Sequence, residues 1–243
     1  MTKELNAYVF FPDKLNLYSD RGNAIILQKR SEWRDIQLNL IEVNGDELID
    51  FKTADMFLIG GGSDREQSLC TEYLFKIKDE FKAAIEDGVA GLTICGGYQF
   101  LGSHYETAAG EKIKSLGIFD FYTKAFSSNP KKRLTGDLHV HNELFGKIVG
   151  FENHSGQTFH DYTPLGQVVS GYGNNKKDKH EGLLYNNLIG TYMHGPMLSK
   201  NPKVADWLLS QALERKYGDS NLAPLDDEFM KKANRNIWRR CIS

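Results

Sequence analysis

Short apolar runs alternate with amphipathic stretches along the first part of the chain. The apolar runs predict four strands, at residues 7–11, 35–43, 55–59 and 91–94. Residues 23–33 and the stretch that follows Ser63 have the spacing of helices. This alternation is typical of an α/β fold in which helices flank a central, mostly parallel sheet.

The stretch that begins at Ser63 has the clearest helical pattern. Ser63 and Glu66 have the spacing of a capping box, and Gly88 has the position of a C-terminal glycine. Between them, apolar side chains recur every third or fourth residue, at Cys70, Leu74, Ile77, Phe81 and Ile85. We therefore expect one continuous helix between Ser63 and Gly88.

Helical periodicity is weak in the next part of the chain. Strand-like segments separated by turns predict an additional β-rich layer, at residues 117–126, 133–141, 147–153, 166–170 and 188–194. Asn201 and Pro202 then begin a last long helix, with Asn201 as the N-cap. With no internal repeat or linker, we expect one domain over residues 1–217 and a polar tail over residues 218–243, with at most a short helix at 226–239.

Composition narrows the possible classes of function. The 243 residues are 40% hydrophobic and 26% charged, with a net charge of −2, so the chain lacks the basic character of nucleic-acid-binding proteins. Its three cysteines form no paired framework, which fits a reducing compartment. The N-terminus has no signal-peptide pattern, and no apolar run is long enough to cross a bilayer. We therefore expect a cytoplasmic protein without direct membrane insertion.

Cys95 ends an apolar run and is followed by two glycines, Gly96 and Gly97. Small residues at this place permit the sharp strand-to-helix turn that presents a nucleophile to solvent. A helix that starts directly after the turn would favour the thiolate. The alternative is a buried structural cysteine, but the glycine pair favours a nucleophile.

A cysteine nucleophile needs a base, and His194 has the best position among the seven histidines. It follows a predicted strand, and carboxyl ends of strands in α/β folds converge on one crevice. The alternative is a histidine with a structural role. His139 and His141 alternate on one predicted strand and thus share a face, but no third ligand accompanies them, so we expect no metal site.

Two further segments offer groups for a substrate. Glycines 60–62 follow a predicted strand and precede a capped helix, so that a backbone N–H of this loop and that of Gly96 are candidates for an oxyanion hole. The alternative is a tight turn without a ligand. Arg133 begins a strand of the β-rich part and has the chemistry to bind a carboxylate through two hydrogen bonds.

Together these features resemble class I glutamine amidotransferases of the cobyric-acid-synthase type. Residues 94–99 match the C-x-G-x-Q nucleophile motif of that class. More specific segments are similar to the GatD family, the glutaminase subunits of bacterial lipid II isoglutaminyl synthase: FPDKLNLYSDRGN at 11–23, GGGSDREQ at 60–67 and FENHSG at 151–156. The resemblance extends to about Tyr217.

The resemblance implies a role for each matching residue. Cys95 would attack the side-chain amide of L-glutamine, and His194 would protonate the departing ammonia and then activate water. Backbone N–H groups near Gly61 and of Gly96 would hold the oxyanion. Arg133 would bind the substrate's α-carboxylate, and Gln99 would line the site.

Class I enzymes commonly have glutamate two residues after the histidine, whereas this chain has Pro196, which cannot orient the ring. The resemblance also implies a heterodimer with a Mur-ligase-like subunit that amidates the stem-peptide D-glutamate of lipid II. We expect no cofactor in this chain, with ATP and Mg²⁺ bound by the partner. The alternatives are a glutaminase subunit for another amidation, of the cobyric-acid type, a free-standing cysteine amidohydrolase, and a silent binding module.

Overall fold

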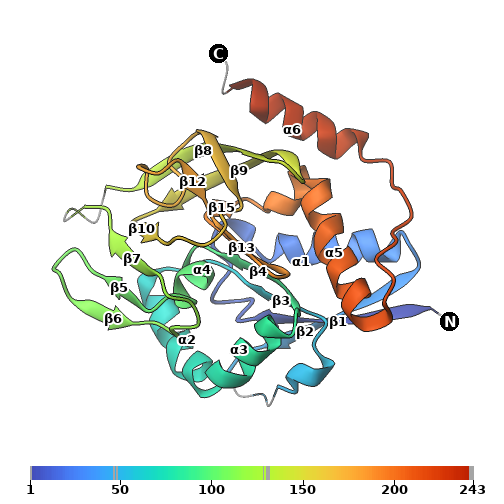
Figure 1. Ribbon diagram of the computed structural model, residues 1–243, viewed down its shortest axis with the longest axis horizontal. Coiled ribbons are helices and arrows are strands. Elements are labelled where there is room, and N and C mark those ends of the chain that lie inside the picture. Colours follow the sequence, from blue (N-terminus) through green and yellow to red (C-terminus); the bar gives the residue numbers. More distant parts are fainter. Residues whose placement is uncertain (1, 46, 48, 128, 130–131, 241–243) are drawn as a thin grey trace.

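The computed structural model describes residues 2–45, 47, 49–127, 129 and 132–240 (Figure 1). Its central sheet has six strands in the order β13-β14-β4-β3-β1-β2. These are β1 (Lys3–Phe10), β2 (Ile36–Val43), β3 (Met56–Ile59), β4 (Ala90–Ile94), β13 (Leu183–Tyr185) and β14 (Leu188–Thr191). Every neighbouring pair is parallel except β13 and β14. The mostly parallel sheet predicted from the sequence is therefore confirmed.

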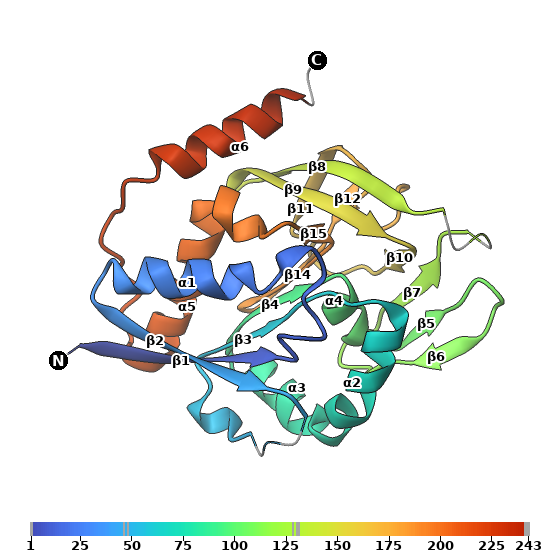
Figure 2. The same ribbon diagram turned by 180° about the vertical axis from the view of Figure 1, so that it is seen from behind.

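Helices cover both faces of this sheet. α1 (Gly22–Glu32) and α5 (Pro202–Tyr217) lie on one face, and α2 (Asp64–Lys76) and α3 (Lys78–Glu86) lie on the other (Figure 1 and Figure 2). The shorter helices are α4 (Gly96–Phe100), η1 (Leu17–Ser19), η2 (Phe51–Thr53) and η3 (Met197–Lys200). Because β1, β3, β4 and β14 are parallel, the segments that follow them meet at one edge of the sheet.

The expectation of one continuous helix between Ser63 and Gly88 is wrong. The capping box of Ser63 and Glu66 is present, but α2 ends at Lys76, and α3 begins at Lys78. Ile77 between them has a ψ of 7°, which is not helical. Cys70, Leu74, Phe81 and Ile85 of the apolar stripe are buried on both sides of the break, and Ile77 is partly buried. The hydrophobic pattern therefore continues across the interruption and could not reveal it.

The β-rich part contains two further sheets. The four-stranded sheet has the order β10-β7-β5-β6, from β5 (His104–Glu106), β6 (Lys112–Lys114), β7 (Tyr122–Ala125) and β10 (Gly156–Phe159). The five-stranded sheet has the order β12-β11-β8-β9-β15, from β8 (Leu134–Asn142), β9 (Gly146–His154), β11 (Gly166–Ser170), β12 (His180–Glu181) and β15 (Met193–His194). The additional β-rich layer is thus confirmed.

The assignment of residues 188–194 wholly to this layer needs a correction. Leu188–Thr191 forms β14 of the central sheet, parallel to β4, whereas Met193–His194 forms β15 of the five-stranded sheet. β14 lies between β13 and β4 in the central sheet, and all four of its residues are buried. The segment therefore crosses from one sheet to the other, and His194 lies where the two sheets meet.

The tail contains the expected short helix, α6 (Glu228–Arg240), which packs beside β9 and η3. Arg30 of α1 is only 1% exposed and forms ion pairs with Asp206 of α5 at 2.7 Å and with Asp227 of the tail at 2.6 Å. The tail is therefore tied to α1 and α5 by a buried guanidinium. The domain boundary at residue 217 stays a prediction.

Asn201 occupies the N-cap position of α5, as predicted, but its side chain does not cap the helix. Instead, its Oδ1 accepts from the Val149 N–H at 3.0 Å, and its Nδ2 donates to the Val149 and Met197 carbonyls. The side chain thus joins α5 to the five-stranded sheet. In the described part of the chain, no helix combines the length and apolar character needed to span a membrane.

Candidate active site

Cys95 lies in the turn between β4 and α4, in a strained backbone conformation with φ 52° and ψ −105°. Such backbone strain costs about 1–3 kcal/mol and is concentrated at functional sites. A Cβ at Gly97 would lie 2.6 Å from the Ile59 carbonyl oxygen, and one at Gly96 would lie 2.6 Å from the Gln67 amide. Close packing against the backbone therefore requires Gly97, whereas the flexible Gln67 side chain could move away from a Cβ at Gly96. The two small residues permit the elbow expected from the sequence.

His194 lies beside this turn although it is ninety-nine residues away in the sequence. A Cβ at Gly61 would lie 2.8 Å from His194 Cε1 and 3.1 Å from Cys95 Cβ, so the two side chains converge on one point of the glycine loop. The Cys95 N–H also donates to the Thr191 carbonyl at 2.8 Å, which ties the elbow to the segment leading to His194. The structure thus brings the predicted nucleophile and base together.

The His194 ring is fully buried, and its two nitrogens differ in environment. Nδ1 hydrogen-bonds to the Asp20 carboxylate, 2.9 Å from Oδ2 and 3.1 Å from Oδ1. Nε2 has no hydrogen-bond partner among the described residues. Asp20 therefore fixes the ring and leaves Nε2 for the reaction, as an orienting carboxylate does in Ser-His-Asp sites.

The surroundings of His194 favour its protonated form. Burial opposes the charge, but the hydrogen bond to Asp20 and the neighbouring Cys95 outweigh burial and raise the pKa of His194 to about 10. The ring therefore holds its proton throughout the neutral range. An imidazolium next to a thiol is the arrangement that activates cysteine nucleophiles.

Asp20 is the functional residue that sequence reasoning missed. It precedes α1 after β1, and it lies within the segment 11–23 that carries the family resemblance. The expected position for an orienting acid is 196, where Pro196 instead packs against Gly22, 2.3 Å from a Cβ built there. The sequence does contain one signal for Asp20. It is an acidic residue that follows β1, and β1 ends at the same edge of the sheet as β4.

The prediction that the Gly61 N–H holds the oxyanion needs a correction. Its N–H donates to Asp20 Oδ2 at 2.9 Å and is therefore not available to an oxyanion. Among the described residues, nothing accepts the N–H of the next residue, Gly62, which lines the same cavity as Cys95. Gly96 begins α4, so its N–H has no partner within the helix. Gly62 and Gly96 are thus the better pair of donors.

A cavity of about 470 Å³ opens above the thiol, and Cys95, Gln99 and Arg133 all line it. Gln99 is mostly buried, and its Nε2 donates to the Tyr192 hydroxyl at 3.1 Å. Arg133 is exposed and donates through Nε and a terminal N–H to Asn153. These contacts use two of the five guanidinium N–H groups, so others remain for a carboxylate.

The two histidines considered for a metal do not form a site. His139 Nε2 is 2.9 Å from the Ile237 carbonyl, and its ring packs against Trp238 of α6, whereas His141 is exposed. The part of the chain described by the structure contains no group of three acidic, histidine or cysteine side chains that could hold a metal.

Comparison with known proteins identifies the family. A model of the "CobB/CobQ-like glutamine amidotransferase domain" matches residues 6–202. The chain is also 56% identical over 213 residues to "Lipid II isoglutaminyl synthase (glutamine-hydrolyzing) subunit GatD" of Staphylococcus aureus (strain N315), covering 88% of this chain and 86% of that protein. The chain is a glutamine amidotransferase of the GatD family.

Other relatives agree with this assignment. The amidotransferase is 37% identical over 232 residues to the GatD subunit of Streptococcus pneumoniae (strain ATCC BAA-255 / R6), covering 94% of this chain and 88% of that protein. Its fold is similar to "PurLQS from Thermotoga maritima", with a TM-score of 0.57 and 18% identity over 88% of this chain and 99% of that one. It is also similar to the glutaminase domain of Trypanosoma brucei CTPS, with a TM-score of 0.53 and 10% identity over 90% of this chain and 96% of that one. The predicted fold class and enzyme class are therefore confirmed.

Proposed function

We propose that this chain is the glutaminase subunit of a lipid II isoglutaminyl synthase and works through a cysteinyl thioester. Two observations support the proposal. The Staphylococcus aureus relative that carries this name is 56% identical over most of both chains. The geometry of Cys95, His194 and Asp20 supplies a nucleophile, an acid–base group and its orienting carboxylate. The proposed mechanism rests on the second observation.

In the proposed reaction, the Cys95 thiolate attacks the side-chain amide carbon of glutamine and forms a tetrahedral oxyanion. The Gly62 and Gly96 N–H groups would stabilise that charge. The His194 imidazolium gives its proton to the leaving nitrogen, so ammonia departs and a glutamyl thioester remains on Cys95. Neutral His194 then takes a proton from water, which attacks the thioester and releases glutamate. The sum is glutamine plus water to glutamate plus ammonia.

The ammonia would pass to a Mur-ligase-like partner that amidates the stem-peptide D-glutamate of lipid II. A closed route between the subunits makes chemical sense, because water would protonate ammonia to ammonium, which is not a nucleophile. We propose that ATP and Mg²⁺ bind to the partner and that this chain needs no cofactor. The heterodimer would then work in the cytoplasm near the inner membrane face, where its lipid-linked substrate lies.

The deciding experiment is a glutaminase assay of the chain with and without the coexpressed Mur-ligase-like subunit. We expect the two chains to copurify and the complex to convert glutamine and lipid II to glutamate and amidated lipid II when ATP is added. Glutamine hydrolysis without any stable ligase partner would favour a free-standing amidohydrolase. Amidation of a cobalamin precursor instead of lipid II would favour a cobyric-acid-type function. Binding of the ligase without any glutamine hydrolysis would favour a silent module.

Arg133→Ala is expected to raise KM for glutamine by about 10- to 150-fold, with a smaller effect on kcat. The reason is the loss of hydrogen bonds to a charged group, which contribute about 1.5–3 kcal/mol. Steady-state kinetics measure the change, and Lys132→Ala removes a neighbouring exposed cation as the control. An unchanged KM in Arg133→Ala would exclude Arg133 from substrate binding.

A further inference from the structure

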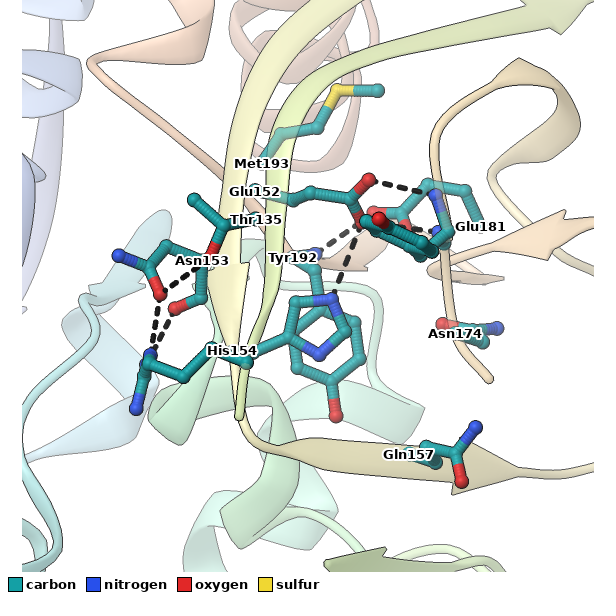
Figure 3. Close-up of polar contacts among 12 residues, drawn as sticks. Thr135, Glu152, Asn153, His154, Gln157, Asn174, Glu181, Tyr192 and Met193 are labelled. Atoms are coloured by element: carbon teal, nitrogen blue, oxygen red, sulfur yellow. Dashed lines mark hydrogen bonds and ion pairs between the residues drawn. The ribbon is translucent and has the colours of Figure 1, made fainter. Parts of the chain in front are cut away.

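Two glutamates beside the active site are fully buried, and the proposed reaction uses neither. Glu152 lies on β9 and Glu181 on β12 (Figure 3). The Glu181 carboxylate contacts the segment that precedes His194, whereas that of Glu152 is directed at the loop after β11 and at His154. Burying a carboxylate is costly unless hydrogen bonds or a counter-charge compensate for the lost water. The contacts of each carboxylate therefore indicate what it holds in place.

Both oxygens of Glu152 are occupied. Oε1 accepts from the Tyr172 N–H at 2.7 Å, while Oε2 accepts from the Gly173 N–H at 3.0 Å and lies 3.3 Å from His154 Nε2. The backbone contacts fix the orientation of the carboxylate, so that Oε2 is directed at the imidazole. Glu152 therefore joins the loop after β11 to the end of β9.

His154 is held from both sides of its ring. Nδ1 lies 2.7 Å from the Gly156 carbonyl, which only accepts, so Nδ1 carries a hydrogen. Nε2 faces Glu152 Oε2 at 3.3 Å, so both ring nitrogens have a partner. With both nitrogens held, the ring lies flat on Tyr192, with a centroid distance of 3.8 Å and an interplanar angle of 14° (Figure 3).

Tyr192 connects this pair to the reacting groups. Its hydroxyl accepts from Gln99 Nε2 in the cavity wall and lies 2.7 Å from Thr158 Oγ1. Two residues later in the chain, His194 pairs with Phe151 of β9, directly next to Glu152. The strand that carries His194 thus pairs with β9, and Tyr192, on which His154 of β9 stacks, directly precedes it in the chain.

We propose that Glu152 and His154 form a positioning pair that holds Tyr192, and through it His194, in register with Cys95. This inference rests on the glutamine hydrolysis proposed above. Neither residue is a catalytic residue. His154 lines the same cavity as Cys95, but the Gly156 carbonyl and Glu152 hold both of its ring nitrogens, and Glu152 is not among the described residues that line this cavity. Their effect is on the geometry of the acid–base group.

Glu181 provides a matched control because its contacts are different. Only its Oε1 is used, accepting from Thr191 Oγ1 at 2.6 Å and from the Tyr192 N–H at 2.8 Å. Among the described residues, Oε2 has no partner, and burial raises the pKa of Glu181 to about 7. Glu181→Gln can keep both hydrogen bonds with its amide oxygen. Glu152→Gln cannot, because an NH₂ group in place of either oxygen would face a backbone N–H.

The test compares Glu152→Gln, His154→Phe, their double mutant and Glu181→Gln, in the form in which the wild type hydrolyses glutamine. We expect Glu152→Gln and His154→Phe each to lower kcat by about 10- to 100-fold, because a small displacement of a reacting group has an effect of this size. KM should change by less than about threefold, because Arg133 is held by Asn153 on β9 rather than by this pair. Glu181→Gln should stay within about threefold of the wild type in both constants.

Two further measurements separate positioning from a loss of folding. If the pair acts as one unit, the double mutant should lose no more activity than the worse single variant. Alkylation of Cys95 by iodoacetamide at neutral pH, followed by peptide mapping, should slow about tenfold in both single variants without any substrate.

Wild-type kcat in His154→Phe, additive losses in the double mutant, or a rise in KM without a fall in kcat would overturn the inference. If Glu152→Gln does not fold, His154→Phe alone still tests the inference. Its phenyl ring keeps the stack on Tyr192, so this variant should fold. Failure of the wild type itself to hydrolyse glutamine would instead overturn the proposed function.

Discussion

Cys95→Ala is expected to abolish the release of glutamate and ammonia from glutamine, with a fall in kcat of at least about 10⁴-fold. The thioester forms only on this sulfur, and the remaining oxyanion donors cannot supply a nucleophile. The small side chain should leave the fold and partner binding intact, because the substitution removes only the sulfur atom and keeps the Cβ in the turn. Coupled detection of glutamate measures the loss.

Cys70→Ala is the matched control for this experiment. Cys70 is fully buried in α2, and burial raises the pKa of its thiol to about 11, so it is neither exposed nor ionised at neutral pH. We expect Cys70→Ala to lower the unfolding temperature but to keep kcat and KM. Ammonia release that survives in Cys95→Ala would exclude the thioester mechanism.

Asp20→Asn is expected to lower kcat by about 10³- to 10⁴-fold and to move the alkaline limit of activity to lower pH. The size follows from the loss of an orienting carboxylate, which leaves the ring in the wrong tautomer or orientation. The direction follows from the pKa of His194, which Asp20 helps to raise to about 10. Without that carboxylate, burial still opposes the charge, so the ring loses its proton at a lower pH. A pH profile of kcat from neutral to alkaline conditions measures the shift.

The control for Asp20→Asn is Asp55→Asn, which neutralises another buried carboxylate. Asp55 accepts from the Asn6 N–H at 2.7 Å and pairs with Lys216 at 2.8 Å, before β3 and thus at the opposite edge of the sheet from Cys95. Asp55→Asn should lower stability without changing the pH profile. An Asp20→Asn variant with wild-type kcat and an unchanged alkaline limit would show that another group orients His194.

Local patterns predicted those parts of the fold that depend on neighbouring residues. Alternating apolar runs identified β1, β3 and β4, and the cysteine followed by glycines identified the elbow, because both signals lie within a few residues. His194 was found by its place at the end of a strand. These features depend on strand geometry and turn sterics, which a short segment contains in full.

The partner of His194 could not be found in the same way. Asp20 and His194 are 174 residues apart, and their contact depends on how β1 and β14 are placed in the sheet. For the same reason, the division of residues 188–194 between two sheets was missed, since each strand alone has the same apolar character. Long-range pairing leaves no periodic signal in the residues that take part.

The buried ion pairs of Arg30 matter for the preparation of shortened forms of the enzyme. A fragment that stops at residue 217 would lose Asp227 and leave the guanidinium inside the protein with half of its counter-charge. Removing one partner of a buried pair typically costs about 3–5 kcal/mol. Because Arg30 belongs to the helix that starts two residues after Asp20, this loss would weaken the support of the acid that orients His194. A minimal glutaminase should therefore keep its last helix, or replace Arg30 with an apolar side chain when that helix is removed.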